Sequence, residues 1–219
     1  MATSTKLIIV NNITLPEEAK HFVFYQDPLK PGLDTDVFVW RTLNIQSGGG
    51  QGYITVPFDV QYTASVTHSS GSGETSKPYS AKNGDVLTVT KDTGSDAPIL
   101  TKRSSAPAPN PSTNYVAVKN EYAGVKQVVV QALKNGSPLV QQTMIDLGDV
   151  AQFEIHSVVY LAWRSDLQQG DSFKSGTYAA TSQKIDLTDP ITQLPAKTVK
   201  VTVTNKGNEI QIKVEYPSN

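Results

Sequence analysis

Apolar and polar residues alternate along the last part of the chain, and this pattern restricts the fold more than any other feature of the sequence. The alternation runs through residues 200–204 and again through 209–216, with Asn205-Lys206-Gly207-Asn208 between the two runs. A period of two places one set of side chains on each face of a β-strand, and Asn and Gly supply the positive φ angles of a tight turn. The sequence therefore predicts a β-hairpin with one buried face and one exposed face.

The same kind of alternation recurs along the rest of the chain. Turn residues separate the runs about every 8–12 residues, a spacing typical of all-β sandwiches and barrels. Helical signals are limited to segments long enough for a single turn. The predicted fold class is therefore all-β. The further runs are 54–60, 86–90, 125–133 and 158–163.

Two stretches of the sequence resemble each other and are separated by a proline-rich segment. The first stretch contains Val10-Asn11-Asn12, 22–25, Leu43-Asn44-Ile45, Gly48-Gly49-Gly50 and 53–56. The second contains Val118-Lys119-Asn120, 128–130, Met144-Ile145-Asp146, Gly148 and 153–155. Proline lacks the N–H that helices and sheet ladders need, so the segment between the stretches is predicted to be an extended linker.

This duplication predicts two domains of similar size. The predicted domains are an N-terminal β-sandwich over 1–105, a proline-rich linker over 106–114 and a C-terminal β-sandwich over 115–219. Each copy has the size of an immunoglobulin-like domain, so we expect two tandem immunoglobulin-like antiparallel β-sandwiches. The alternative is one large sandwich or barrel in which residues 106–114 form a surface loop.

Composition narrows the classes of function. Nineteen Lys and Arg residues against twenty Asp and Glu give a net charge of −1, so the chain lacks the basic excess of a nucleic-acid-binding protein. The chain has no cysteine, which excludes disulfides and thiolate metal sites and favours an intracellular protein. Residues 7–10 are the only apolar run near the start, shorter than the roughly 7–15 residues of a secretory signal. We expect a cytoplasmic protein without a transmembrane segment.

No motif for catalysis, metal binding or cofactor binding is present. The three histidines, His21, His68 and His156, are far apart in sequence, so no strand presents a histidine pair to a metal. The glycine-rich segment 48–52 is followed by neither a Lys-Ser/Thr pair nor a helix, and is therefore predicted to be a hairpin turn. The sequence predicts no metal and no cofactor.

Aromatic residues next to arginines are the best candidates for a binding site. Trp40-Arg41 and Trp163-Arg164 combine a flat apolar ring with a planar donor group, which suits stacking against a sugar or another flat polar ligand. The competing interpretation is that each tryptophan packs in a sandwich core. The predicted ligand-binding residues are Trp40, Arg41, Tyr62, His156, Tyr160, Trp163 and Arg164.

One segment also resembles a known group of proteins. Val39-Trp40-Arg41-Thr42-Leu43, then Gly48-Gly49 and then residues 53–57, is similar to a segment of small fungal and bacterial tandem β-sandwich proteins of unassigned function. The resemblance covers most of the chain but its matched motif is short and structural. It implies a tandem β-sandwich and an intracellular protein, and it implies no chemistry and no functional residues.

Three functions remain open from the sequence. The leading hypothesis is a non-enzymatic, lectin-like binding module for a carbohydrate or another small polar ligand at aromatic and loop surfaces. The second is a cofactor-free enzyme, a cyclase or isomerase of small-molecule biosynthesis, with a pocket at the domain junction. The third is a self-assembling structural or toxin-like protein, and pairing of sheet edges could also produce a homodimer.

Overall fold

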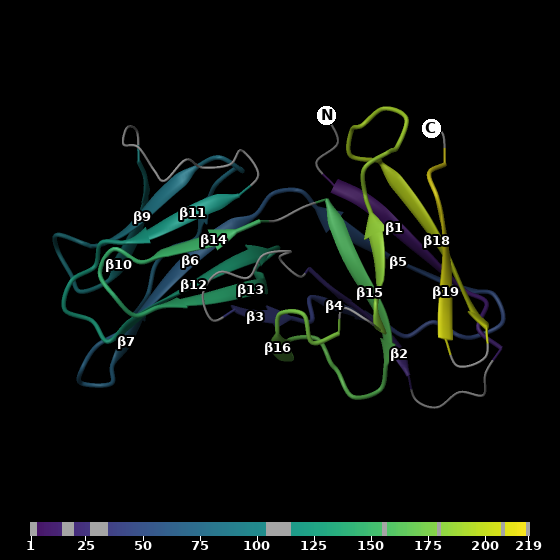
Figure 1. The fold of residues 1–219 in the computed structure, drawn as a ribbon, viewed down its shortest axis with the longest axis horizontal. Coiled ribbons are helices and arrows are strands. Elements are labelled where there is room, and N and C mark those ends of the chain that lie inside the picture. Colours follow the sequence, from purple (N-terminus) through teal and green to yellow (C-terminus); the bar gives the residue numbers. More distant parts are fainter. Residues whose placement is uncertain are drawn as a thin grey trace. The chain divides into compact units, whose positions relative to one another are not determined.

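The computed structural model describes residues 4–14, 20–26, 35–103, 115–154, 157–178, 181–206 and 209–217. Within these residues the regular structure is β-strand, which confirms the predicted all-β class (Figure 1). In the same part of the chain, no helical segment has the length and apolar character that spanning a bilayer requires.

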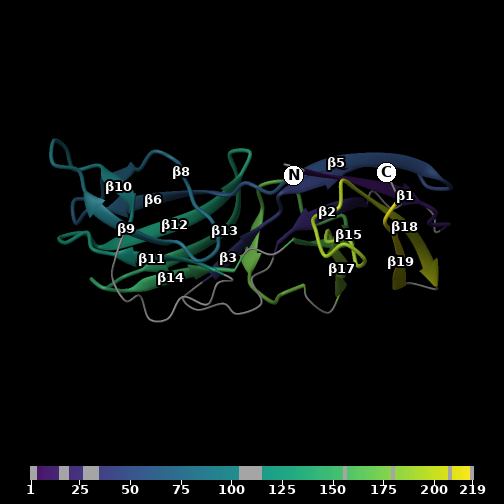
Figure 2. The ribbon, with the colours of Figure 1, turned by 90° about the horizontal axis from the view of Figure 1, so that it is seen from above.

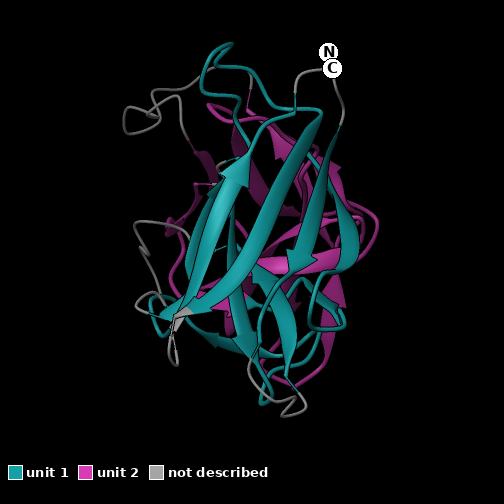
Figure 3. Ribbon diagram, turned by 90° about the vertical axis from the view of Figure 1, so that its right-hand side faces the viewer, with its two compact units in different colours: residues 1–26, 38–58, 157–219 teal, residues 27–37, 59–156 magenta. Residues whose placement is uncertain are grey.

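The chain divides into two compact units, and each unit is built from separate segments of the sequence (Figure 3). Unit 1 comprises Met1–Gln26, Phe38–Phe58 and Ser157–Asn219, and unit 2 comprises Asp27–Val37 and Asp59–His156. The strands of unit 1 are β1 (Ser4–Asn11), β2 (His21–Tyr25), β4 (Arg41–Leu43), β5 (Gly50–Pro57), β15 (Val158–Arg164), β16 (Ser172–Lys174), β17 (Gln183–Asp186), β18 (Thr198–Lys206) and β19 (Glu209–Glu215).

The strands of unit 2 come mainly from the middle of the chain. They are β6 (Gln61–Thr67), β7 (Gly73–Thr75), β8 (Tyr79–Ser80), β9 (Val86–Lys91), β10 (Pro98–Lys102), β11 (Val116–Asn120), β12 (Gln127–Lys134), β13 (Ser137–Met144) and β14 (Val150–Phe153). The strand β3 (Thr35–Phe38) pairs with β13 through Thr35, Asp36 and Val37.

These units do not follow the predicted division at residues 106–114. The predicted linker lies outside the described residues, but the hairpin before it, β9–β10, and the strand after it, β11, belong to one sheet of unit 2, in which β9 pairs with β11. In unit 1, β1 pairs with β18, so the two ends of the chain share a sheet. The physical reason for the difference is that strands choose partners by hydrogen bonding and burial, which sequence proximity does not fix.

Unit 1 contains two four-stranded sheets. The first has the order β19-β18-β1-β5 and the second the order β17-β15-β2-β4 (Figure 1). The hairpin expected near the end of the chain is confirmed, because β18 and β19 are antiparallel and pair Val201 with Val214. In contrast, β1 and β18 are parallel and pair Ile9 with Val201. The sheet is therefore mixed rather than purely antiparallel.

Unit 2 also contains two sheets. One has the order β10-β9-β11-β14, in which β9 and β11 are parallel. The other contains β3-β13-β12-β6-β7, and β8 also pairs with β6. In Figure 2 the two sheets of this unit appear as separate layers. Their inner faces meet where the rings of Tyr62 and Phe153 pack edge to face, with ring centroids 5.5 Å apart.

A buried amide also joins the two sheets of unit 2. The Gln142 side chain, on β13, is fully buried. Its Nε2 donates to the Gln152 carbonyl over 2.6 Å, and its Oε1 accepts from the Gln152 N–H over 2.9 Å. The amide therefore satisfies both backbone groups of a β14 residue that has no strand partner on that side.

A buried lysine makes the stability of unit 2 depend on pH. Lys134, at the end of β12, is 3% exposed, and burial lowers its pKa from 10.5 to about 8. Between these two values the unfolded chain binds the proton and the folded chain releases it, so stability rises with pH. We expect the free energy of unfolding to increase by about 2 kcal/mol from about pH 7 to about pH 9.5, as measured by urea unfolding.

The variant Lys134→Met is the control for this titration, because it keeps most of the side-chain volume and removes the charge. Its stability should change little over the same range, and parallel curves for the two proteins would contradict the assignment. The measurement stops below about pH 10, because burial raises the pKa of Tyr62 and stability is lost where tyrosine ionises in the unfolded chain.

Candidate ligand-binding site

Two of the predicted binding residues lie in the cores of the units. Trp40 and Tyr62 are each 1% exposed. Trp40 follows β3, and its N–H donates to the Phe24 carbonyl over 2.8 Å. Tyr62 packs against Phe153 inside unit 2. Neither ring presents a face to solvent, so the competing interpretation of core packing describes their positions.

Arg41 and Trp163 are half-buried and engaged with neighbouring side chains. The Arg41 guanidinium carbon lies 5.1 Å from the ring centroid of Trp40, and its Nη1 donates to the Trp40 carbonyl over 3.2 Å. The Lys20 ammonium lies 4.8 Å from the ring centroid of Trp163. The two Trp-Arg pairs therefore have different environments. His156 lies outside the described residues.

Tyr160 and Arg164 lie on one face of β15. Cross-strand pairing places Tyr160 opposite Tyr25, and Arg164 opposite His21. The Tyr25 and Tyr160 rings are stacked, with centroids 5.4 Å apart and planes 13° from parallel. Because alternate residues of a strand share a face, Ala162 lies between Tyr160 and Arg164 on this surface. Of the predicted residues, the structure brings these two onto a common surface.

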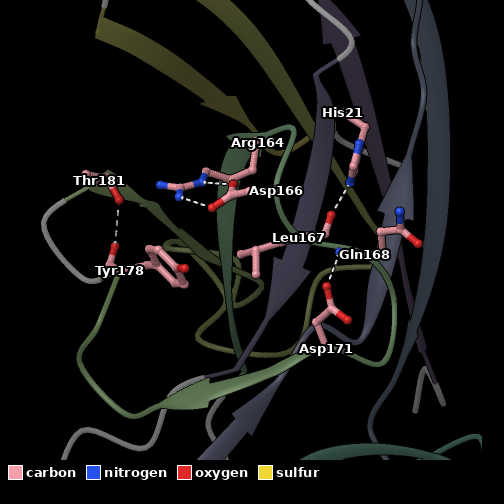
Figure 4. Close-up of polar contacts among 8 residues, drawn as sticks. All are labelled: His21, Arg164, Asp166, Leu167, Gln168, Asp171, Tyr178 and Thr181. Carbon is pink, nitrogen blue, oxygen red and sulfur yellow. Dashed lines mark hydrogen bonds and ion pairs between the residues drawn. The ribbon is translucent and has the colours of Figure 1, made fainter.

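The segment after β15 folds back over this face and is fixed at several points (Figure 4). His21 Nε2 donates to the Leu167 carbonyl, and the Leu167 side chain is buried against Val23, Val39 and Ala162. The Gln168 N–H donates to Asp171 Oδ2 over 2.7 Å. Backbone bonds between residues 170–171 and Val39 complete the attachment. The loop therefore holds a defined position over the sheet.

An ion pair lies at the start of this loop. Arg164 Nε donates to Asp166 Oδ1 over 2.8 Å, and Nη2 donates to Oδ2 over 2.6 Å. This two-bond geometry is the strong, directional form of an arginine–carboxylate pair. The hydrogen bonds from Arg164 lower the pKa of Asp166, and those to Asp166 raise the pKa of Arg164. The Asp166 side chain is 55% exposed, so solvent reaches the pair.

A row of aromatic rings begins at the guanidinium. The guanidinium carbon of Arg164 lies 4.5 Å from the ring centroid of Tyr178. Tyr178 packs edge to face on Phe173 at 4.8 Å, and Phe173 packs edge to face on Tyr25 at 5.1 Å. The Thr181 N–H donates to the Tyr178 carbonyl over 3.1 Å. We call Tyr160, Arg164, Asp166, Phe173 and Tyr178 the aromatic–arginine site.

Three members of the aromatic–arginine site were absent from the sequence prediction. Asp166 follows Arg164 by two residues, and this close acid–base spacing was a usable signal. Phe173 and Tyr178 lie in a stretch without regular alternation, so sequence alone gave no reason to place them against β15.

A second polar cluster lies in unit 2. The Tyr122 hydroxyl donates to the Asp96 carbonyl over 2.5 Å, and Lys91 forms an ion pair with Asp96. The His68 ring packs edge to face on Tyr122, and its buried Nε2 has no hydrogen-bond partner among the described residues. In the described part of the chain, no group of His, Asp or Glu side chains is arranged to hold a metal ion.

Comparisons with protein-family models, curated proteins and solved structures find no match to this chain. The resemblance to small fungal and bacterial tandem β-sandwich proteins therefore stays a prediction.

Proposed function

We propose that the protein is a non-enzymatic binding module, and that its ligand is a neutral ring rich in hydroxyl groups, such as a sugar. The observation that carries this proposal is the Arg164–Asp166 pair held beside the Tyr178 ring. An aromatic ring offers an apolar face for the C–H groups of a sugar, and the pair offers both donors and acceptors for its hydroxyls.

The charge of the site supports a neutral ligand. Arg164 and Asp166 neutralise each other through two hydrogen bonds, so an anionic or cationic ligand would have to displace one partner. A hydroxyl group can accept from the guanidinium edge and donate to the exposed carboxylate while the pair stays intact. The fixed loop also reduces the entropy lost when the ligand binds.

The type of sandwich is also part of this proposal. We infer that each unit is a variant of the immunoglobulin-like sandwich, which the two sheets of each unit support. The parallel pairs β1–β18 and β9–β11 are its departure from the purely antiparallel form. A cytoplasmic location and a homodimer remain predictions from the sequence. The enzymatic alternative gave a role to His156, which lies outside the described residues.

Binding of the full chain to the glycans on an array tests the proposal. We expect selective binding of neutral glycans, and a loss of about tenfold in affinity for Tyr178→Ala, because stacking on one ring contributes about 1 kcal/mol or more. Arg164→Met should weaken binding by a similar factor, since it removes the donors and keeps the aliphatic stem.

Tyr53→Ala is the matched control for Tyr178→Ala. Tyr53 is 60% exposed on β5, its ring lies under the Lys6 ammonium, and it is outside the aromatic–arginine site. This variant should bind as tightly as the original protein. An array on which the full chain binds no glycan, or an equal loss of affinity in Tyr53→Ala, would rule out the proposed site.

A further inference from the structure

The mixed sheets of the two units have the same strand arrangement. In unit 1, the hairpin β18–β19 places β18 parallel to β1, and β1 is antiparallel to β5. In unit 2, the hairpin β9–β10 places β9 parallel to β11, and β11 is antiparallel to β14. Strand by strand, the order β19-β18-β1-β5 corresponds to β10-β9-β11-β14.

The second sheets correspond in the same way. In unit 1, β2 lies between β4 and β15, both antiparallel to it, and β17 lies beyond β15. In unit 2, β12 lies between β13 and β6, both antiparallel to it, and β7 and β8 lie beyond β6. In unit 2, the described strands without a counterpart are β3 and one of the two short strands β7 and β8, since unit 1 has only β17 in that position.

A buried asparagine makes the same bonds in both units. Asn11 Nδ2 donates to the Ile45 carbonyl over 2.8 Å, and Asn120 Nδ2 donates to the Asp146 carbonyl over 3.0 Å. Each Oδ1 accepts from the N–H two residues later, at 3.1 Å and 3.0 Å. Each asparagine carbonyl accepts from a glycine N–H, Gly49 at 2.7 Å and Gly148 at 2.8 Å.

The backbone around each asparagine, which we call the asparagine corner, also matches between the two units. The residue after each asparagine donates its N–H to a parallel strand, Asn12 to Val203 over 2.8 Å and Glu121 to Val89 over 3.0 Å. Gly49 and Gly148 have φ angles of 105° and 95°, in the region that favours glycine. Shared strand order is common among β proteins, but a matched set of side-chain and backbone bonds around one buried residue indicates one repeated structure.

The corresponding strands occur in a different order along the chain. In unit 1 the strands β1, β2, β4 and β5 precede β15, β17, β18 and β19, whereas in unit 2 the counterparts β11–β14 follow β6–β10. We propose that residues 1–105 and 115–219 are two copies of one fold that have exchanged their second halves. The first half of each copy is then a docking surface, and its occupant is the second half of the other copy.

The length of the connection between the halves explains the exchange. Only Phe58, Asp59 and Val60 separate β5 from β6, and such a connection extends at most about 14 Å. Without exchange, the connection would have to lead from β5 to a β6 that occupies the position of β15 in unit 1. β5 contacts β4, at the edge of the other sheet, and the β15 position is two strands further along that sheet. With strands about 4.8 Å apart and sheets about 10 Å apart, that path is also about 14 Å, which leaves no residue for a turn. Short connections of this kind favour domain swapping.

Cleavage of the folded full chain between the copies tests the exchange. A protease recognition site is inserted within residues 106–114, the purified protein is cut, and the product is passed over a sizing column without denaturant. We expect both fragments in one peak at the position of the uncut 23.7 kDa chain, because each unit needs strands from both fragments. In concentrated guanidinium chloride the same sample should elute at about half the mass of the uncut chain under the same conditions, which shows that the cut is complete.

Elution at about half the mass of the uncut chain without denaturant would overturn the proposal, since tandem domains do not need each other. For a chain that resists the protease, backbone NOEs of the uncut protein decide the same question. Contacts of β1 with β18 support the exchange, whereas contacts of β1 with β9 overturn it. Neither result depends on whether the aromatic–arginine site binds a glycan.

Discussion

Replacing Phe153 with alanine is expected to lower the free energy of unfolding by about 4 kcal/mol. Phe153 lies on β14, is 1% exposed and packs edge to face on Tyr62 of the opposite sheet, with ring centroids 5.5 Å apart. The substitution removes the apolar contact area and leaves a cavity between sheets that cannot close fully. Urea unfolding followed by far-UV circular dichroism would measure the loss.

Ile145→Ala is the control for this cavity. Ile145 is a large apolar residue of the same unit but is 70% exposed, so its truncation should change stability by less than about 0.5 kcal/mol. If Phe153→Ala were as mild as Ile145→Ala, the two sheets of unit 2 would not be packed through Phe153.

Replacing Asn120 with alanine is expected to cost about 3 kcal/mol of stability, and replacing Asn11 with alanine should cost a similar amount. Each side chain is buried, and its removal leaves the backbone N–H two residues later without its acceptor and takes one donor away from a backbone carbonyl. An unsatisfied buried group costs about 1–3 kcal/mol. Urea unfolding of the two variants would show whether the two corners contribute equally, as their matched bonds predict.

The same substitution at an exposed asparagine provides the reference. Asn83 is exposed in the turn before β9, and Asn83→Ala should change stability by less than about 0.5 kcal/mol. A mild effect at Asn120 with a large effect at Asn11 would contradict the equivalence of the two corners.

Local features of the fold were predictable from the sequence. Alternation along 200–204 and 209–216 predicted the β18–β19 hairpin, because a strand that buries one face repeats every second residue and a short turn joins neighbours. The choice of partner for β1 was not predictable. Val201 of β18 and Leu87 of β9 are both apolar strand residues, and nothing in the sequence near Ile9 favours one over the other.

Part of the candidate site was also predictable from the alternation along one strand. Tyr160 and Arg164 are four residues apart on one strand, and alternate residues of a strand share a face, so their common face was predictable. Trp40 has the same type of neighbour in sequence as Trp163, but burial depends on the layers above it, which sequence proximity to an arginine does not reveal. Tyr178 reaches Arg164 through an irregular loop, whose path depends on bonds such as His21 to Leu167.

Backbone NOEs in the intact protein test the central claim most directly, because exchanged and unexchanged copies use the same strands with different partners. The account predicts contacts between Ile9 and Val201 and between Val118 and Leu87, the paired residues of the two parallel ladders. Contacts between Ile9 and Leu87 and between Val118 and Val201 would contradict it, since each copy would then be complete within its own half of the chain.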